Sequence, residues 1–128
     1  MNNYKKVLLF KVGAEKQKQI KSISESYGIQ VLLVPLKYYE EEIGALAGIM
    51  GMKIHGKKYT GPEFPAEMMI FSGIDSEELD HFLKRYRDAK IDPIGLKAIL
   101  TPSNVQWTPK QLQEELLKEH QAFQKSQK

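Results

Sequence analysis

Residues 67–83 read EMMIFSGIDSEELDHFL and carry the signals of a strand, a turn and a helix in succession. The run of residues 68–71 is continuously apolar, as in strands that are covered on both faces, and Ser72 and Gly73 supply a turn. Asp75 then stands at the position of a helix N-cap, and Glu78 three residues later completes a capping box. Apolar residues recur afterwards at helical spacing, which predicts an amphipathic helix over residues 76–89.

The same alternation of strand and helix signals extends in both directions from this stretch. Three more apolar runs are each followed by turn residues and are predicted to be strands: residues 7–10, 31–34 and 98–100. A helix is predicted over residues 14–27, with Gly28 as a left-handed C-terminal cap. A last helix is predicted to begin at Thr108, with a proline at its first position and a glutamine two residues after that proline.

This order predicts a single α/β domain over residues 1–128, built in three layers. We expect a small four-stranded, mainly parallel sheet with helices on both faces, because helical crossovers join parallel strands. Residues 7–10 and 68–71 are the most apolar runs and are expected to be adjacent central strands. A ferredoxin-like α+β fold is the alternative, although its open sheet predicts more alternation of polar and apolar residues than the strands contain.

The linking region between the second and third strands has weaker signals. One short helix is expected over about residues 41–49, followed by a mobile loop over about residues 51–65 that is rich in Lys, Gly and Pro. The acidic residues Glu40, Glu41 and Glu42 are interpreted as a solvated helix start. At the other end of the chain, residues 124–128 are expected to form a frayed tail.

Within that loop, residues 51–58 read GMKIHGKK and resemble a phosphate-binding P-loop in every position except the last. A P-loop requires a preceding buried strand, a following helix and a Ser or Thr that binds magnesium. Here Lys58 takes the hydroxyl position, and two prolines follow within seven residues. We therefore do not expect ATP or GTP to bind, and no cofactor is predicted.

Composition excludes several other classes of function. The net charge is +3 and the lysines are interspersed with Gln and Ser, so nucleic-acid binding is not expected. No long apolar run is present, which excludes a membrane span and favours a cytoplasmic protein. The chain has no cysteine, and its three histidines lack metal-ligand spacing, so no metal site and no catalytic residue are predicted.

A parallel sheet binds ligands at the carboxyl ends of its strands. The residues at these ends, the candidates for ligand binding, are Gly13, Ser72, Gly73, Thr101 and Asn104. The competing interpretation is that such residues simply form tight turns. Asn104 is expected to hydrogen-bond nearby main chain, and Trp107 is expected to be mostly buried against the last helix; an exposed Trp107 would instead indicate a surface for a partner.

Residues 67–120 also resemble the bacterial family named domain of unknown function 3783. The positions that carry the resemblance are Phe71, Ser72, Gly73, Leu79, Asp80, Phe82, Leu83, Leu96, Lys97, Ala98, Thr101, Pro102, Asn104, Trp107 and Thr108. The resemblance implies a bacterial source and transfers no catalytic residue, because the family has no assigned function.

The sequence thus favours a non-enzymatic binding or regulatory module that uses the carboxyl edge of its sheet. The alternative is an enzyme of unknown reaction that acts on a small ligand at the same edge. The identity of the partner stays open at this point, and a protein partner and self-association are both compatible with the sequence.

Overall fold

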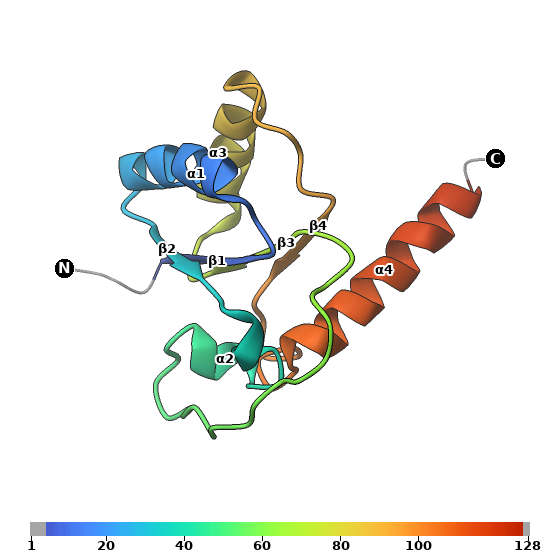
Figure 1. Cartoon of the computed structure of the whole chain (residues 1–128). Coiled ribbons are helices and arrows are strands. Elements are labelled where there is room, and N and C mark those ends of the chain that lie inside the picture. Colours follow the sequence, from blue (N-terminus) through green and yellow to red (C-terminus); the bar gives the residue numbers. More distant parts are fainter. Residues whose placement is uncertain (1–4, 127–128) are drawn as a thin grey trace.

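The computed structural model describes the backbone of residues 5–126 and the side chains of residues 5–120, so residues 127 and 128 of the expected frayed tail lie outside it. All the predicted elements are present and differ from the predictions by a few residues at their ends (Figure 1). In chain order they are β1 (Lys6–Phe10), α1 (Ala14–Ser26), β2 (Gln30–Leu33), η1 (Leu36–Tyr38), α2 (Ile43–Leu46), β3 (Met68–Ser72), α3 (Ser76–Asp88), β4 (Leu96–Ile99) and α4 (Pro109–Ser126).

The four strands form one sheet in the order β2-β1-β3-β4, so the predicted central pair of β1 and β3 is confirmed. β1 pairs with β2 in parallel, and β3 pairs with β4 in parallel. β1 and β3 are antiparallel, with Lys6 opposite Ser72 and Phe10 opposite Met68. The sheet is therefore mixed, and the expectation of a mainly parallel sheet is wrong.

The mixed sheet follows from how the strands are connected. Each parallel pair is joined through a helix, α1 for β1 and β2 and α3 for β3 and β4, as a parallel connection requires. The two pairs are joined by the long segment 34–67, which contains only η1 and α2. A connection of this length can return the chain in either direction, and here it reverses the direction of β3 relative to β1.

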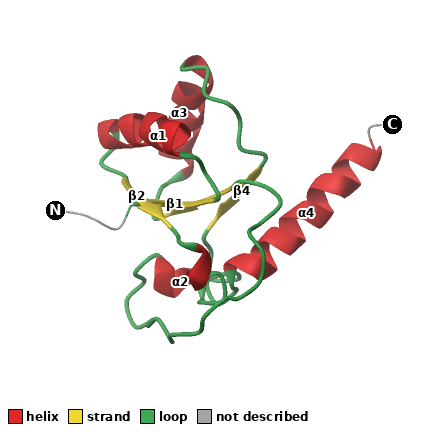
Figure 2. Cartoon of the chain, in the orientation of Figure 1, coloured by secondary structure: helices red, strands yellow, loops and turns green. Residues whose placement is uncertain are grey.

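Both faces of the sheet carry a hydrophobic core. α1 and α3 lie on one face, and α2 and the start of α4 lie toward the other (Figure 2). On the first face the strand residues pack with side chains of the two helices, such as Ile20 and Phe82. On the second face they pack with Tyr39, Phe64 and Leu112. This arrangement explains why β1 and β3 are continuously apolar.

The local signals at helix ends are largely confirmed. The Asp75 side chain accepts a hydrogen bond from the Glu78 backbone N–H at 2.8 Å. The Glu78 carboxylate does not complete the expected box but lies 3.0 Å from Lys5 Nζ. At the start of α4 the box is complete, since the Thr108 N–H donates to Gln111 Oε1 at 2.9 Å and the Gln111 N–H donates to Thr108 Oγ1 at 3.1 Å.

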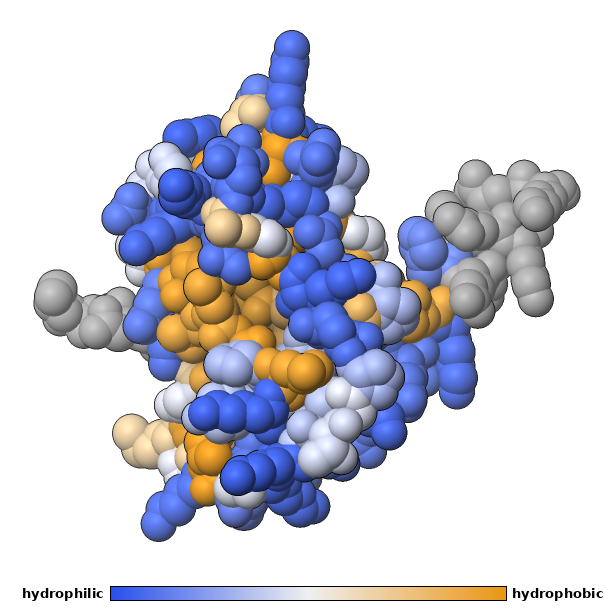
Figure 3. Space-filling model, in the orientation of Figure 1, coloured by the Kyte–Doolittle hydropathy of each residue, from blue (hydrophilic) through white to orange (hydrophobic). Residues whose placement is uncertain are grey.

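The surface of the molecule is mostly hydrophilic, with an apolar area over β1 and β2 on the face shown in Figure 3. Leu33 of β2, an edge strand, is 51% exposed. Among residues 5–126, no helix combines the length and the apolar composition that crossing a bilayer requires.

Candidate functional site

Four of the five candidate residues come together at one edge of the sheet. β3 and β4 are parallel and neighbours, so Ser72 and Gly73 lie beside Thr101, and Asn104 belongs to the same turn after β4. The Leu100 N–H donates to the Phe71 carbonyl at 2.8 Å and continues the pairing beyond the last ladder residue. A hollow of about 410 Å³ opens at this edge, lined by Ile49, Ser72, Gly73, Leu100, Thr101, Pro102 and Val105.

Gly13, the fifth candidate, lies at the opposite end of the sheet. Because β1 is antiparallel to β3, Phe10 pairs with Met68, and the chain that leaves β1 runs beside the segment that enters β3. Lys11 Nζ accordingly donates to the Pro65 carbonyl at 3.3 Å. The grouping of Gly13 with the other four candidates assumed parallel central strands, and the mixed sheet separates it from them.

One wall of the hollow depends on contacts between α2 and the turn after β4. The backbone N–H groups of Ile43 and Gly44, which have no partner within a helix, donate to the carbonyls of Trp107 and Val105 at 2.8 and 2.9 Å. A Cβ atom on Gly44 would overlap Val105 Cγ2 and Met52 Sδ, so only glycine fits here without a shift of its neighbours. Sequence reasoning did not assign Gly44, Ile49 or Val105 to the site.

A local signal for these residues does exist. Residues 44–48 read GALAG, with two glycines and two alanines around Leu46, and such small residues are typical of close packing between backbone segments. That signal indicates a tight contact but does not say what is contacted. The partner is 61 residues further along the chain, at Val105, so the wall could be recognised only in the folded structure.

Asn104 holds the turn after β4 in place, as predicted. Its Oδ1 accepts from the Thr101 N–H at 2.8 Å, and its Nδ2 donates to the Ile99 carbonyl at 3.1 Å. The prediction for Trp107 is wrong, because its side chain is 36% exposed. Its carbonyl bonds to the start of α2, and its partly exposed ring is compatible with a surface for a partner.

The chemistry of the hollow is simple. Of its seven lining residues, four are the apolar residues Ile49, Leu100, Pro102 and Val105, and the only side-chain polar groups are the hydroxyls of Ser72 and Thr101. None of the seven side chains titrates near neutral pH, so the lining itself supplies no general acid or base. This arrangement can accept an apolar group and orient it with one or two hydrogen bonds.

The loop that contains GMKIHGKK is bound to a buried carboxylate. Glu41 is fully buried, and its Oε1 and Oε2 accept from the backbone N–H groups of His55 and Lys57 at 2.7 and 2.8 Å. A carboxylate of the chain itself therefore takes two amides that a phosphate would use in a P-loop. The interpretation of Glu41 as solvated is wrong. Residues 51–65 contain no helix or strand, and their mobility stays a prediction.

Comparison with known proteins identifies a relationship over part of the chain. Residues 67–123 match the sequence model of the family described as domain of unknown function (DUF3783), which confirms the resemblance over that segment. The matched segment contains β3, α3, β4 and most of α4, and with them Ser72, Gly73, Thr101 and Asn104. No curated protein and no solved structure matches the chain.

Proposed function

We propose that this protein is a non-enzymatic binding or regulatory module that holds an apolar group in the hollow at the carboxyl ends of β3 and β4. The group belongs to a small ligand or to another macromolecule. The observation that carries the proposal is the composition of the lining, which is apolar apart from two hydroxyls and contains no ionisable side chain. Catalysis at the same edge would need a base to activate Ser72 or Thr101, and the lining offers none.

Exposed apolar side chains near this edge support the proposal. Ile49, which lines the hollow, is 39% exposed, and the neighbouring Met50 is almost completely exposed. Burying such side chains against an apolar group is favourable, at about 25 cal/mol for each Å² removed from water. The turn that forms the other wall is fixed by the hydrogen bonds of Asn104, so the hollow is formed before the ligand arrives.

The proposal can be tested with a thermal-shift screen of small apolar compounds and a pair of matched variants. Ile49→Glu places a charge in the hollow, whereas Ile54→Glu places the same charge on a similarly exposed isoleucine that does not line it. We expect compounds that raise the Tm of the unmodified protein to lose this effect in Ile49→Glu and to keep it in Ile54→Glu. Stabilisation that survives Ile49→Glu unchanged, or conversion of a compound to a product, would contradict the proposal.

A further inference from the structure

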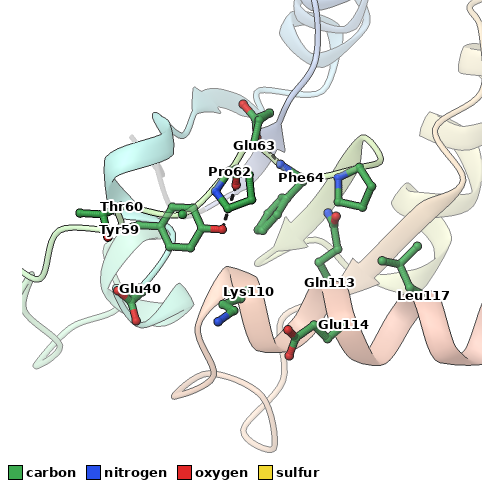
Figure 4. Close-up of a pocket in the computed structure, with 12 residues that line it drawn as sticks. Glu40, Tyr59, Thr60, Pro62, Glu63, Phe64, Lys110, Gln113, Glu114 and Leu117 are labelled. Atoms are coloured by element: carbon green, nitrogen blue, oxygen red, sulfur yellow. Dashed lines mark hydrogen bonds between the residues drawn. The ribbon is translucent and has the colours of Figure 1, made fainter.

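A second and larger hollow lies on another part of the molecule. It has a volume of about 530 Å³ and lies between the segment of residues 59–65 and the first turns of α4 (Figure 4). Its lining includes the charged side chains of Glu40, Glu63, Lys110 and Glu114 and the aromatic rings of Tyr59 and Phe64. It shares no lining residue with the hollow at the sheet edge, and its chemistry is different because most of these side chains are polar.

A buried amide in this hollow has an unused acceptor. Gln113 is only 1% exposed, and its side chain points from α4 toward the wall that contains Phe64 (Figure 4). Its Nε2 donates to the Ala66 carbonyl at 3.2 Å. Since a carbonyl can only accept, this bond fixes the orientation of the amide. Oε1 is then left buried without a hydrogen-bond partner among the described residues.

Leaving a buried acceptor unsatisfied is unfavourable, so a ligand that donates a hydrogen bond to Gln113 Oε1 would gain from it. The required partner is a donor, so an ionised carboxylate or a phosphate oxygen that carries no proton cannot fill this position. Burial on α4 and the bond to Ala66 hold the amide still, and a fixed acceptor loses little conformational freedom on binding.

The charges around the hollow favour a cation. Among residues 5–120, three carboxylates, those of Glu40, Glu63 and Glu114, line it together with a single ammonium group, that of Lys110. Glu63 is held in place, because its Oε1 accepts from the Tyr39 hydroxyl at 2.7 Å and from the Phe64 N–H at 2.8 Å. Burial, followed by this hydrogen bond and the charge of Glu63, raises the pKa of Tyr39, as expected beside a negative charge.

Aromatic rings supply a surface for the apolar part of such a ligand. The Tyr59 hydroxyl donates to the Pro62 carbonyl at 2.8 Å, which orients the ring along the wall of the hollow (Figure 4). Phe64 is stacked on Tyr39 with ring centroids 4.0 Å apart, and the ring centroid of Tyr59 lies 5.5 Å from that of Tyr39. The face of an aromatic ring attracts an organic cation as well as an alkyl chain.

We propose that this hollow binds an organic cation with N–H donors, an alkylammonium or a guanidinium group on a short alkyl chain. An N–H group donates to Gln113 Oε1, the positive charge lies near the carboxylates of Glu63 and Glu114, and the alkyl chain packs on Tyr59. The source of the cation is either a free amine or the side chain of Lys or Arg. This binding goes beyond the function proposed for the sheet edge and does not depend on it.

Calorimetric titration with agmatine, with putrescine and with N-acetyl-arginine amide tests the proposal. We expect saturable binding of at least one of them, weakened at high ionic strength because the attraction is partly between charges. Gln113→Leu keeps the apolar stem and removes the acceptor, and we expect it to weaken binding about tenfold, as for loss of a hydrogen bond to a charged group. Binding of the blocked arginine identifies a side chain as a source, whereas binding of the two free amines alone identifies a small metabolite.

A matched pair of charge variants separates a site from general attraction. Glu114→Gln removes a carboxylate from the hollow, and Glu115→Gln removes the same charge from the next residue of α4, which does not line it. We expect weaker binding for Glu114→Gln and unchanged binding for Glu115→Gln. The proposal is overturned if none of the three probes binds at millimolar concentration, if the two variants weaken binding equally, or if correctly folded Gln113→Leu binds as tightly as the unmodified protein. Ile49→Glu should leave this binding unchanged, so either proposal can fail without the other.

Discussion

Replacing Glu41 with Gln should destabilise the protein, although Glu41 lies in a run of three glutamates that reads as solvent-exposed. The structure buries this side chain completely and bonds each carboxylate oxygen to a backbone N–H, one from His55 and one from Lys57. These two bonds close the segment of residues 51–58 onto the start of α2. The segment has no helix or strand of its own, so its path depends on such contacts.

The magnitude follows from the two bonds. Glutamine keeps one acceptor oxygen and presents an NH₂ group to the second backbone N–H, so one bond to a charged acceptor is lost and two donors face each other. A bond of this kind contributes about 1.5–3 kcal/mol, so we expect Glu41→Gln to lower the free energy of unfolding by about 2 kcal/mol. Glu41→Ala loses both bonds and leaves a void, and we expect a loss of about 4 kcal/mol.

Urea denaturation of the unmodified protein and the variants measures these values. Glu40→Gln is the matched control, because it removes the same charge from the adjacent residue, which is exposed. We expect it to change the free energy of unfolding by less than about 0.5 kcal/mol. Hydrogen exchange adds a local readout, since the amides of His55 and Lys57 should lose protection in Glu41→Gln. The reasoning is refuted if Glu41→Gln is as stable as Glu40→Gln, or if both amides exchange equally fast before and after the substitution.

Three further predictions concern single side chains. Trp107→Ala should lower the free energy of unfolding, measured in urea melts, by about 1–2 kcal/mol. This is below the range for a fully buried aromatic, because Trp107 is 36% exposed, and a loss above about 3 kcal/mol would contradict the prediction. Burial, together with the charges of Glu67 and Asp92, raises the pKa of Tyr86 to about 12, so its contribution to stability should be complete below pH 10 and decline as pH rises toward 12. Tyr86→Phe should remove that part of the decline in melts at pH 9 and pH 11. Gly44→Ala should cost about 1–3 kcal/mol because its Cβ meets Val105, whereas Gly95→Ala, with nothing within 4 Å, should be close to neutral.

The candidate site was only partly predictable from the sequence. Ser72, Gly73, Thr101 and Asn104 could be identified because each follows a strand that its own residues define. Ile49 and Val105 line the same hollow but come from segments that meet only through the contact of α2 with the turn after β4. Glu41 was interpreted as solvated, and Gln113 was not assigned to the core or to a site, because a polar residue shows no local sign of burial when its partner is distant in the chain.

The sequence by itself determined which segments form helices and strands, and where α3 and α4 begin. The capping interactions of Asp75 and Thr108 span three residues, so the energies that favour them act within the segments in which they are read. The apolar runs specified β1 and β3 as central strands for a similar reason, since covering both faces of a strand requires every residue to be apolar.

Only the tertiary structure decided the direction of β3 relative to β1. Within each helical crossover the short connection leaves one arrangement, a parallel pair, but the segment of residues 34–67 is long enough to reach either end of β1. In the observed arrangement, side chains of that segment such as Tyr39 and Phe64 pack together and cover one face of the sheet. Because β1 and β3 are antiparallel, Gly13 and Ser72 lie at opposite ends of the sheet. Local sequence signals could not predict this separation, since strand direction depends on contacts between residues far apart in the chain.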